Sequence, residues 1–141
     1  MIAETDSLQS AAREYLDASL CVLPAKRAEK RPAVGRWGQY RKRLPTESEV
    51  SAWFAEGPDA LCIICGEVSG NLELLDFDKR AELFEPWCAK VRQRAPGLLE
   101  RLVISRTQND GRHAAYRHEG EICGNLKLAQ HKDADGIVTL I

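Results

Sequence analysis

The chain has 141 residues, 44% of them apolar and 29% charged, which suits one core-forming domain and argues against a disordered segment. Its net charge of −1 gives no general attraction to nucleic acid, so polyanion binding would depend on local clusters of Lys and Arg. No apolar stretch approaches the roughly 18 residues that span a bilayer, and the acidic start, Glu4 and Asp6, is unlike a signal peptide. We expect a cytoplasmic location and no membrane association.

Two helices and a short strand are predicted in the first part of the chain. Apolar positions at helical spacing predict a helix from about Ser7 to Ala18, and a strand over 20–23 follows, halted by Pro24. Thr46 and Glu49 have the spacing of a capping box, which predicts the start of a second helix.

A basic, irregular segment, residues 26–43, precedes the second helix. It holds eight Lys and Arg side chains against a single acidic residue, Glu29, and Trp37 and Tyr40 interleave with the cations. Cations that neutralise phosphates beside rings that stack on bases are typical of a surface for a nucleotide or a single strand. A solvated loop whose aromatic residues pack back onto the core is the alternative.

The middle of the chain predicts two strands, 61–65 and 72–77, joined by the segment 66–71. Both runs are mostly apolar, as expected for central strands that are covered on both faces. Cys62 and Cys65 have CxxC spacing, but residues i and i+3 of a strand face opposite sides, so this pair does not suit one zinc ion. We expect the five cysteines to be structural thiols, with metal or redox use as the less favoured alternative.

The last part of the chain predicts helical material over 79–94, with Pro86 near a helix start, and then successive hairpins. The expected strands are 101–106, 113–117, 126–129 and 137–141, with Asp135-Gly136 as the last turn. This order predicts an α+β domain with a mixed, largely antiparallel sheet flanked by helices. From its length we expect residues 1–141 to be a single domain. Because the chain stops inside an apolar run, we expect it to be a fragment that ends within its last strand. A final strand that pairs at the end of the chain is the alternative.

Two carboxylates, Asp76 and Asp78, flank Phe77 at the end of the 72–77 strand. Residues i and i+2 of a strand project to the same face, so the pair would point together while Phe77 turns into the core. Adjacent carboxylates repel unless a cation lies between them, and oxygen ligands suit Mg²⁺ or Mn²⁺. The pair therefore points to two-metal phosphoryl or nucleotidyl transfer. A solvated strand end is the alternative.

A polar turn within 105–113 is the second candidate element. Asn109-Asp110-Gly111 consists of turn formers, and Gly111 would let backbone N–H groups approach a bound anion closely. Arg112 and His113 would add charge and hydrogen-bond donors for a triphosphate. A plain polar hairpin is the alternative.

In this order the motifs resemble the N-terminal bifunctional DNA primase/polymerase (prim-pol) domain of the archaeo-eukaryotic primase superfamily, which is typical of phage and plasmid replication proteins. The segments that carry the likeness are 11–16, 22–24, 30–32, Trp37, 46–54, 66–70, 75–78 and 107–113. The resemblance implies an RRM-like catalytic core and a nucleotidyltransferase that makes or extends DNA primers.

The resemblance also implies roles for single residues. Asp76 and Asp78 would hold catalytic Mg²⁺ or Mn²⁺, and His113 would be catalytic and contact the phosphates of a dNTP or NTP. The nucleotide-binding candidates are Lys30, Asn109, Gly111, Arg112 and His113. The implied partners are a single-stranded DNA template and a helicase-type domain downstream in the parent chain.

Two departures from the family pattern leave alternatives open. The chain has Asn109-Asp110-Gly111 where family members often have Ser-Gly-Gly, and Asp110 brings negative charge towards a triphosphate. The family's third metal-binding carboxylate falls at a strand that resembles 136–141, and nothing acidic follows Asp135. The alternatives are a non-catalytic nucleotide- or single-strand-binding module, degenerate or truncated, and, less favoured, a metal-dependent nuclease.

Overall fold

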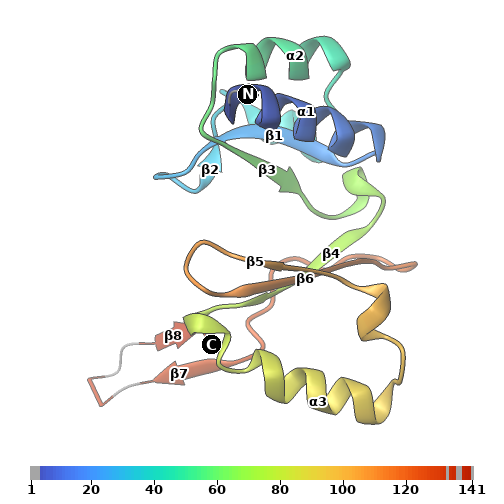
Figure 1. Ribbon diagram of the computed structural model, residues 1–141, viewed down its shortest axis with the longest axis vertical. Helices are drawn as coiled ribbons and strands as arrows, with labels where there is room; N and C mark the ends of the chain where they lie inside the picture. Colours follow the sequence, from blue (N-terminus) through green and yellow to red (C-terminus); the bar gives the residue numbers. More distant parts are fainter. Residues whose placement is uncertain (1–3, 133, 136–137, 141) are drawn as a thin grey trace. The chain divides into compact units, whose positions relative to one another are not determined.

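The computed structural model describes residues 4–132, 134–135 and 138–140 (Figure 1). The chain is α+β, as predicted, and the strand registers that the structure defines are antiparallel. Its strands fall into three small sheets, and the chain divides into two compact units, Met1–Leu72 and Glu73–Ile141. The expectation of a single domain stays a prediction.

The first unit has a three-stranded sheet in the order β2-β1-β3, with two helices side by side over one face (Figure 1). Its elements are α1 (Glu4–Asp17), β1 (Cys21–Lys26), β2 (Arg31–Pro32), η1 (Trp37–Arg41), α2 (Glu47–Ala55), β3 (Ala60–Ile64) and η2 (Glu67–Ser69). The helix predicted from Ser7 is present and begins earlier, at Glu4. The capping box is confirmed, because the Glu49 backbone N–H donates to Thr46 Oγ1 at 3.1 Å and the Thr46 N–H donates to Glu49 Oε1 at 3.0 Å.

Strand β1 is the centre of this unit and is covered on both faces. Val22 packs with Ala12, Val50 and Phe54 beneath the two helices. Its neighbours Cys21 and Leu23 face the other way and pack with Tyr40. The expectation that 61–65 is a central strand is wrong, because among the described residues β3 pairs with β1 alone and lies at the edge of the sheet. Its residues are half-buried and pack into the clusters on both faces.

The prediction that Pro24 ends the first strand is also wrong. Pro24 lies inside β1 opposite Leu61, and its carbonyl accepts a 2.7 Å hydrogen bond from the Ala33 backbone N–H. The N–H and C=O of a strand residue point to the same side, so the missing N–H of Pro24 faces the side of β2. No ladder hydrogen bond to β3 is lost there, and the strand continues to Lys26.

The segment 66–70, which begins and ends with glycine, connects β3 to the next strand. It also hydrogen-bonds the first residue of β1. The Ser69 hydroxyl is buried, donates to the Ile64 carbonyl at 2.5 Å and accepts from the Cys21 backbone N–H at 2.9 Å. Gly66 and Gly70 have φ of 92° and 67°, in the region that favours glycine. The Gly-x-x-Ser-Gly pattern therefore serves packing in the first unit.

The second unit has a sheet in the order β4-β6-β5 and a short hairpin, β7-β8. Its elements are β4 (Leu72–Phe77), η3 (Lys79–Ala81), α3 (Phe84–Arg94), η4 (Leu99–Arg101), β5 (Val103–Arg106), β6 (Arg112–Arg117), β7 (Gln130–Lys132) and β8 (Val138–Leu140). Phe77 packs against α3, with ring centroids 5.3 Å from Phe84 and 5.1 Å from Trp87. Pro86 is the third residue of α3, near its start as predicted.

Other predictions for this unit have mixed outcomes. The strand expected at 126–129 is wrong: this stretch is irregular, and Leu126 and Leu128 are 72% and 77% exposed, so their alternation has nothing to pack against. The predicted turn at Asp135-Gly136 includes Gly136, which lies outside the described residues. All five cysteines are free thiols. None of the described helices is long and apolar enough to cross a membrane.

Candidate active site

The second unit brings Asp76 and His113 into contact. Asp76 is the fifth residue of β4 and His113 the second of β6, and these strands are neighbours in the sheet. His113 Nε2 lies 3.3 Å from Asp76 Oδ1, with the side chains 38% and 53% exposed. The two predicted residues thus form an acid–imidazole pair that solvent and a ligand can reach.

The pair occupies the sheet face opposite α3. Phe77 is buried against α3, so Asp76, its neighbour in an alternating strand, points the other way. Tyr116 and Glu73 hydrogen-bond across the same two strands, and this bond together with burial raises the pKa of Tyr116 to about 12. Glu73 lies three residues before Asp76, and Tyr116 lies three residues after His113. Because side chains alternate along a strand, both project to the sheet face that α3 covers.

Asp78 follows Asp76 across the buried Phe77 and is exposed. Strand β4 ends at Phe77, so Asp78 is the first residue beyond it, and its carbonyl accepts from the Ala81 N–H at 2.9 Å. The exposed–buried–exposed order of 76–78 fits the predicted separation of the carboxylates from the core.

The turn 107–111 packs directly on this strand end. The Thr107 N–H donates to the Gly111 carbonyl at 3.1 Å, and the Asp110 N–H donates to the Thr107 carbonyl at 3.2 Å. A Cβ on Gly111 would lie 2.6 Å from the Phe77 carbonyl oxygen and 2.7 Å from Thr107 Oγ1. Only glycine fits here, because the turn touches the backbone between the two aspartates.

The charge of Asp110 is compensated within the turn. Arg106 Nε donates to Asp110 Oδ1 at 3.0 Å, and Arg106 Nη2 bonds the same oxygen. These hydrogen bonds hold the pKa of Asp110 below its ordinary value. The negative charge that the sequence placed beside a triphosphate is therefore paired with a guanidinium.

Arg112 is placed differently from His113. Consecutive residues of a strand face opposite sides, and Arg112 lies with its guanidinium carbon 5.9 Å from the Phe84 ring of α3. Its Nη1 donates to the carbonyls of Gly111 at 2.9 Å and Asp110 at 3.3 Å. Asn109 is an exposed residue of the turn. Arg112 thus braces the turn from the side opposite His113.

Lys30 belongs to the first unit, at the turn between β1 and β2. Its backbone is left-handed, with φ of 51°, and its N–H donates to the Lys26 carbonyl at 3.0 Å. The side chain is exposed. Its predicted contact with nucleotide phosphates stays a prediction.

The donor set at the end of β4 suits a hard cation that also binds phosphate. Asp76 and Asp78 offer exposed carboxylate oxygens, and Mg²⁺ commonly takes one or two carboxylates and completes its shell with water and phosphate oxygens. Among the described residues, no three His, Cys, Asp or Glu side chains form a group that could hold a metal. The two aspartates fit an ion shared with a nucleotide better than a cage made of protein ligands.

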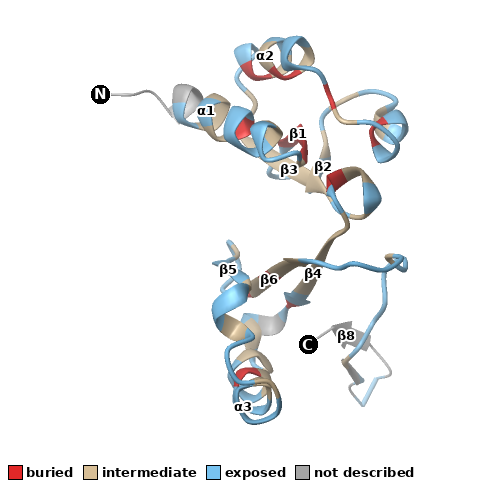
Figure 2. Cartoon of the chain, turned by 90° about the vertical axis from the view of Figure 1, so that its right-hand side faces the viewer, coloured by how far each residue is buried: buried red, intermediate tan, exposed pale blue. Residues whose placement is uncertain are grey.

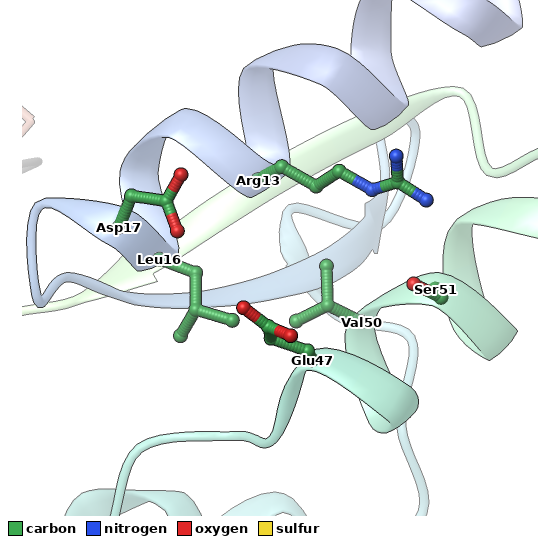
Figure 3. A pocket seen from close by; sticks show the side chains of 6 residues that line it. All are labelled: Arg13, Leu16, Asp17, Glu47, Val50 and Ser51. Atoms are coloured by element: carbon green, nitrogen blue, oxygen red, sulfur yellow. The ribbon is translucent and has the colours of Figure 1, made fainter.

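The first unit has a pocket of its own. It opens between α1 and α2, and Figure 3 shows Leu16 and Val50 beside the carboxylates of Asp17 and Glu47. Arg13 and Ser51 complete its lining. None of the predicted site residues lines this pocket.

Residues 105–107 carry contacts to which the sequence analysis gave no role. Ser105 pairs with His113 in the β5–β6 register and is exposed, so its side chain shares the face of His113. Arg106 and Thr107 hold the turn through Asp110 and Gly111. The i, i+4 spacing of Arg106 and Asp110 at the start of the turn was the signal that could have found this pair.

A scan against protein families matches the model described as bifunctional DNA primase/polymerase, N-terminal (Prim-Pol), over residues 12–137. The match runs through both units and includes every predicted site residue. The chain belongs to the Prim-Pol family. This membership supports a DNA primase/polymerase-type function and, with it, DNA and nucleotide substrates. No curated protein matches the chain.

Proposed function

We propose that this Prim-Pol domain is a template-directed nucleotidyltransferase that makes or extends primers on single-stranded DNA from dNTPs or NTPs. The observation that carries the proposal is the 3.3 Å contact between His113 and Asp76, next to a turn that packs on the Phe77 carbonyl. A phosphate-binding side chain and a metal-binding carboxylate are thereby held together, as a metal-bound triphosphate requires.

In the proposed reaction the primer 3′-oxygen forms a bond to the α-phosphorus, the bond to the β-phosphate oxygen breaks, and pyrophosphate leaves. Mg²⁺ or Mn²⁺ held by Asp76 and Asp78 would activate the hydroxyl and offset the charge that develops on the phosphates. His113 would donate a hydrogen bond to a phosphate oxygen from the open face of β6. The backbone of Asn109 and Gly111, with Arg112 behind it, would shape the turn around the triphosphate, and Lys30 would add a phosphate contact.

The family resemblance alone extends the proposal to a helicase-type ATPase domain in the parent chain and to phage or plasmid replication. A non-catalytic nucleotide- or single-strand-binding module is the alternative, because among the described residues no three His, Cys, Asp or Glu side chains form a group that could hold a metal. A metal-dependent nuclease is less favoured.

The test is nucleotide incorporation on a primed single-stranded template with Mn²⁺. We expect product from the wild-type chain, loss of product in Asp76→Asn and Asp78→Asn, and wild-type product from the control Glu119→Gln, which removes an exposed carboxylate elsewhere in the second unit. Nucleotide binding without incorporation would support the binding module. Cleavage of the template without incorporation would support the nuclease.

A further inference from the structure

The positive charge of this chain is concentrated in one segment. Residues 26–43 hold eight of the 20 Lys and Arg side chains and one of the 21 Asp and Glu side chains. The rest of the chain therefore carries 12 basic and 20 acidic residues. A negatively charged ligand would therefore be attracted to this segment more than to the rest of the chain.

Acidic neighbours compensate part of this charge. Glu29 pairs with Lys26 at 3.6 Å and Arg31 at 2.6 Å, and Glu49 pairs with Arg43 at 2.8 Å. Among the described residues, Arg36, Arg41 and Lys42 have no carboxylate partner. Arg36 and Lys42 flank η1, and Arg41 is its last residue. All three are exposed, and together they are named here the η1 basic surface.

The geometry of η1 explains why its cations face outward. Side chains at i and i+3 of a 3₁₀-helix lie one above the other. Trp37 and Tyr40 therefore share one face, which packs into the core with Leu23 and Cys21. Arg36 and Lys42 stand just before and just after η1, and both are exposed.

The aromatic side chains anchor this element and are not available to stack on bases. Tyr40 is 2% exposed and packs edge-to-face on Trp53 at 5.3 Å. The Arg41 guanidinium lies 4.8 Å from the Trp37 ring centroid, which restrains the cation and covers the ring. The sequence left open whether these rings stack on bases or pack on the core. In the structure they pack on the core.

Arg36 has a backbone conformation that makes its charge simple to remove in a test. It precedes η1 with φ of 56° and ψ of 40°, the left-handed region that favours glycine or asparagine, and its side chain makes no capping hydrogen bond. An arginine in this conformation is a local cost to the fold. Arg36→Gly would therefore remove the charge without adding backbone strain.

From these observations we propose that the η1 basic surface binds the phosphate backbone of single-stranded DNA without reading its bases. The proposal rests on the proposed function for the identity of the strand, which would be the template. Neither η1 nor β2 is long enough to act as a recognition element in a DNA groove, and the rings are packed away. The contacts are therefore ionic and sensitive to salt.

The test is binding of labelled oligo(dT) over about 50–200 mM salt, without nucleotide or divalent metal. The variant combines Arg36→Gln, Arg41→Gln and Lys42→Gln, and the matched control combines Lys90→Gln, Arg92→Gln and Arg94→Gln on α3. Each single-strand phosphate contact adds about 0.7 to the slope of log affinity against log salt, so we expect the slope to fall by about 2 in the variant and stay unchanged in the control. An equal change in both would overturn the proposal.

Two further arms sharpen the result. An abasic oligomer should lose affinity in the variant as oligo(dT) does, and an equal loss on duplex DNA would overturn the assignment to single strands. Arg36→Gly should weaken binding while the melting temperature stays level or rises; unchanged binding would overturn the role of Arg36. Wild-type DNA binding without primer extension would contradict the proposed catalysis and leave this inference standing.

Discussion

The two compact units differ in how they hold their shape. Of the eleven buried apolar side chains among the described residues, eight lie in Met1–Leu72 and three, Phe77, Cys88 and Ala114, lie in Glu73–Ile141 (Figure 2). The first unit covers β1 on both faces. The second unit covers its sheet with α3 and leaves the face of Asp76 and His113 open. Apolar burial is thus the main stabilising contribution in the first unit, and turn contacts define the candidate site in the second.

The largest expected effect is on the core of the first unit. Phe54 lies on α2, is 1% exposed and packs against α1 and β1. Phe54→Ala should therefore lower the free energy of unfolding by about 3–5 kcal/mol. Phe77→Ala should cost less, because the neighbouring Phe84 and Trp87 are half-buried and can relax into the space. Urea denaturation measures both. An equal or larger loss for Phe77→Ala would contradict the claim that apolar burial stabilises the first unit more than the second.

The next effect tests the turn that packs on β4. Gly111→Ala would place a Cβ 2.6 Å from a backbone oxygen, so the turn must shift, at a cost of about 1–3 kcal/mol. If the shift destabilises the nucleotide-binding conformation of the turn by this amount, nucleotide affinity drops about 5- to 150-fold. Fluorescent-nucleotide titration measures it. Gly124→Ala, which meets nothing within 4 Å, is the control, and equal affinities in the two variants would contradict the packing role.

A smaller effect distinguishes charge from structure in the Arg106–Asp110 pair. Arg106→Gln leaves the Asp110 carboxylate unpaired near a bound triphosphate and should weaken its binding. Asp110→Asn keeps a residue that tolerates φ of 61° and frees Arg106, so it should strengthen binding or leave it unchanged. Each change should be small, no more than about fivefold in affinity, because the pair is exposed to solvent. If both variants weaken binding equally, the pair is only a structural clamp.

The smallest effect concerns acid stability of the first unit. Arg43 and Tyr40 hydrogen-bond Glu49 and lower its pKa to about 2. A lowered folded-state pKa contributes stability above the unfolded value of 4.5, and this contribution is lost as pH falls towards 2. Glu49→Gln should remove about 1 kcal/mol at neutral pH and flatten the acid limb of the stability profile. An unchanged acid limb would show that the pair is solvated.

Local patterns predicted the elements that depend on local chemistry. The bounds of β4, the capping box of Thr46 and the place of Pro86 follow from a short apolar run, hydrogen-bond spacing and the fixed φ of proline. Asp76 and His113 were found as members of two motifs, but nothing in either motif specified their 3.3 Å contact. That contact depends on which strands pair, which is a long-range property.

The sequence predictions failed where tertiary partners decide the outcome. Pro24 continues a strand because its missing N–H falls on the side away from β3, and Leu126 and Leu128 stay outside any strand because nothing packs on them. Whether Tyr40 stacks on a ligand or packs on Trp53 could not be read from the basic segment, because both uses need the same residue type.

The central claim is that Asp76, Asp78 and His113 form one site for a metal-bound nucleoside triphosphate. Its most direct test is the affinity of the chain for a nucleoside triphosphate with and without Mn²⁺, measured calorimetrically in the wild type and in Asp76→Asn, Asp78→Asn and His113→Gln. The account predicts that Mn²⁺ tightens wild-type binding by about tenfold or more, that either aspartate variant abolishes this gain, and that His113→Gln weakens binding under both conditions. The same Mn²⁺ dependence in all four proteins would contradict it.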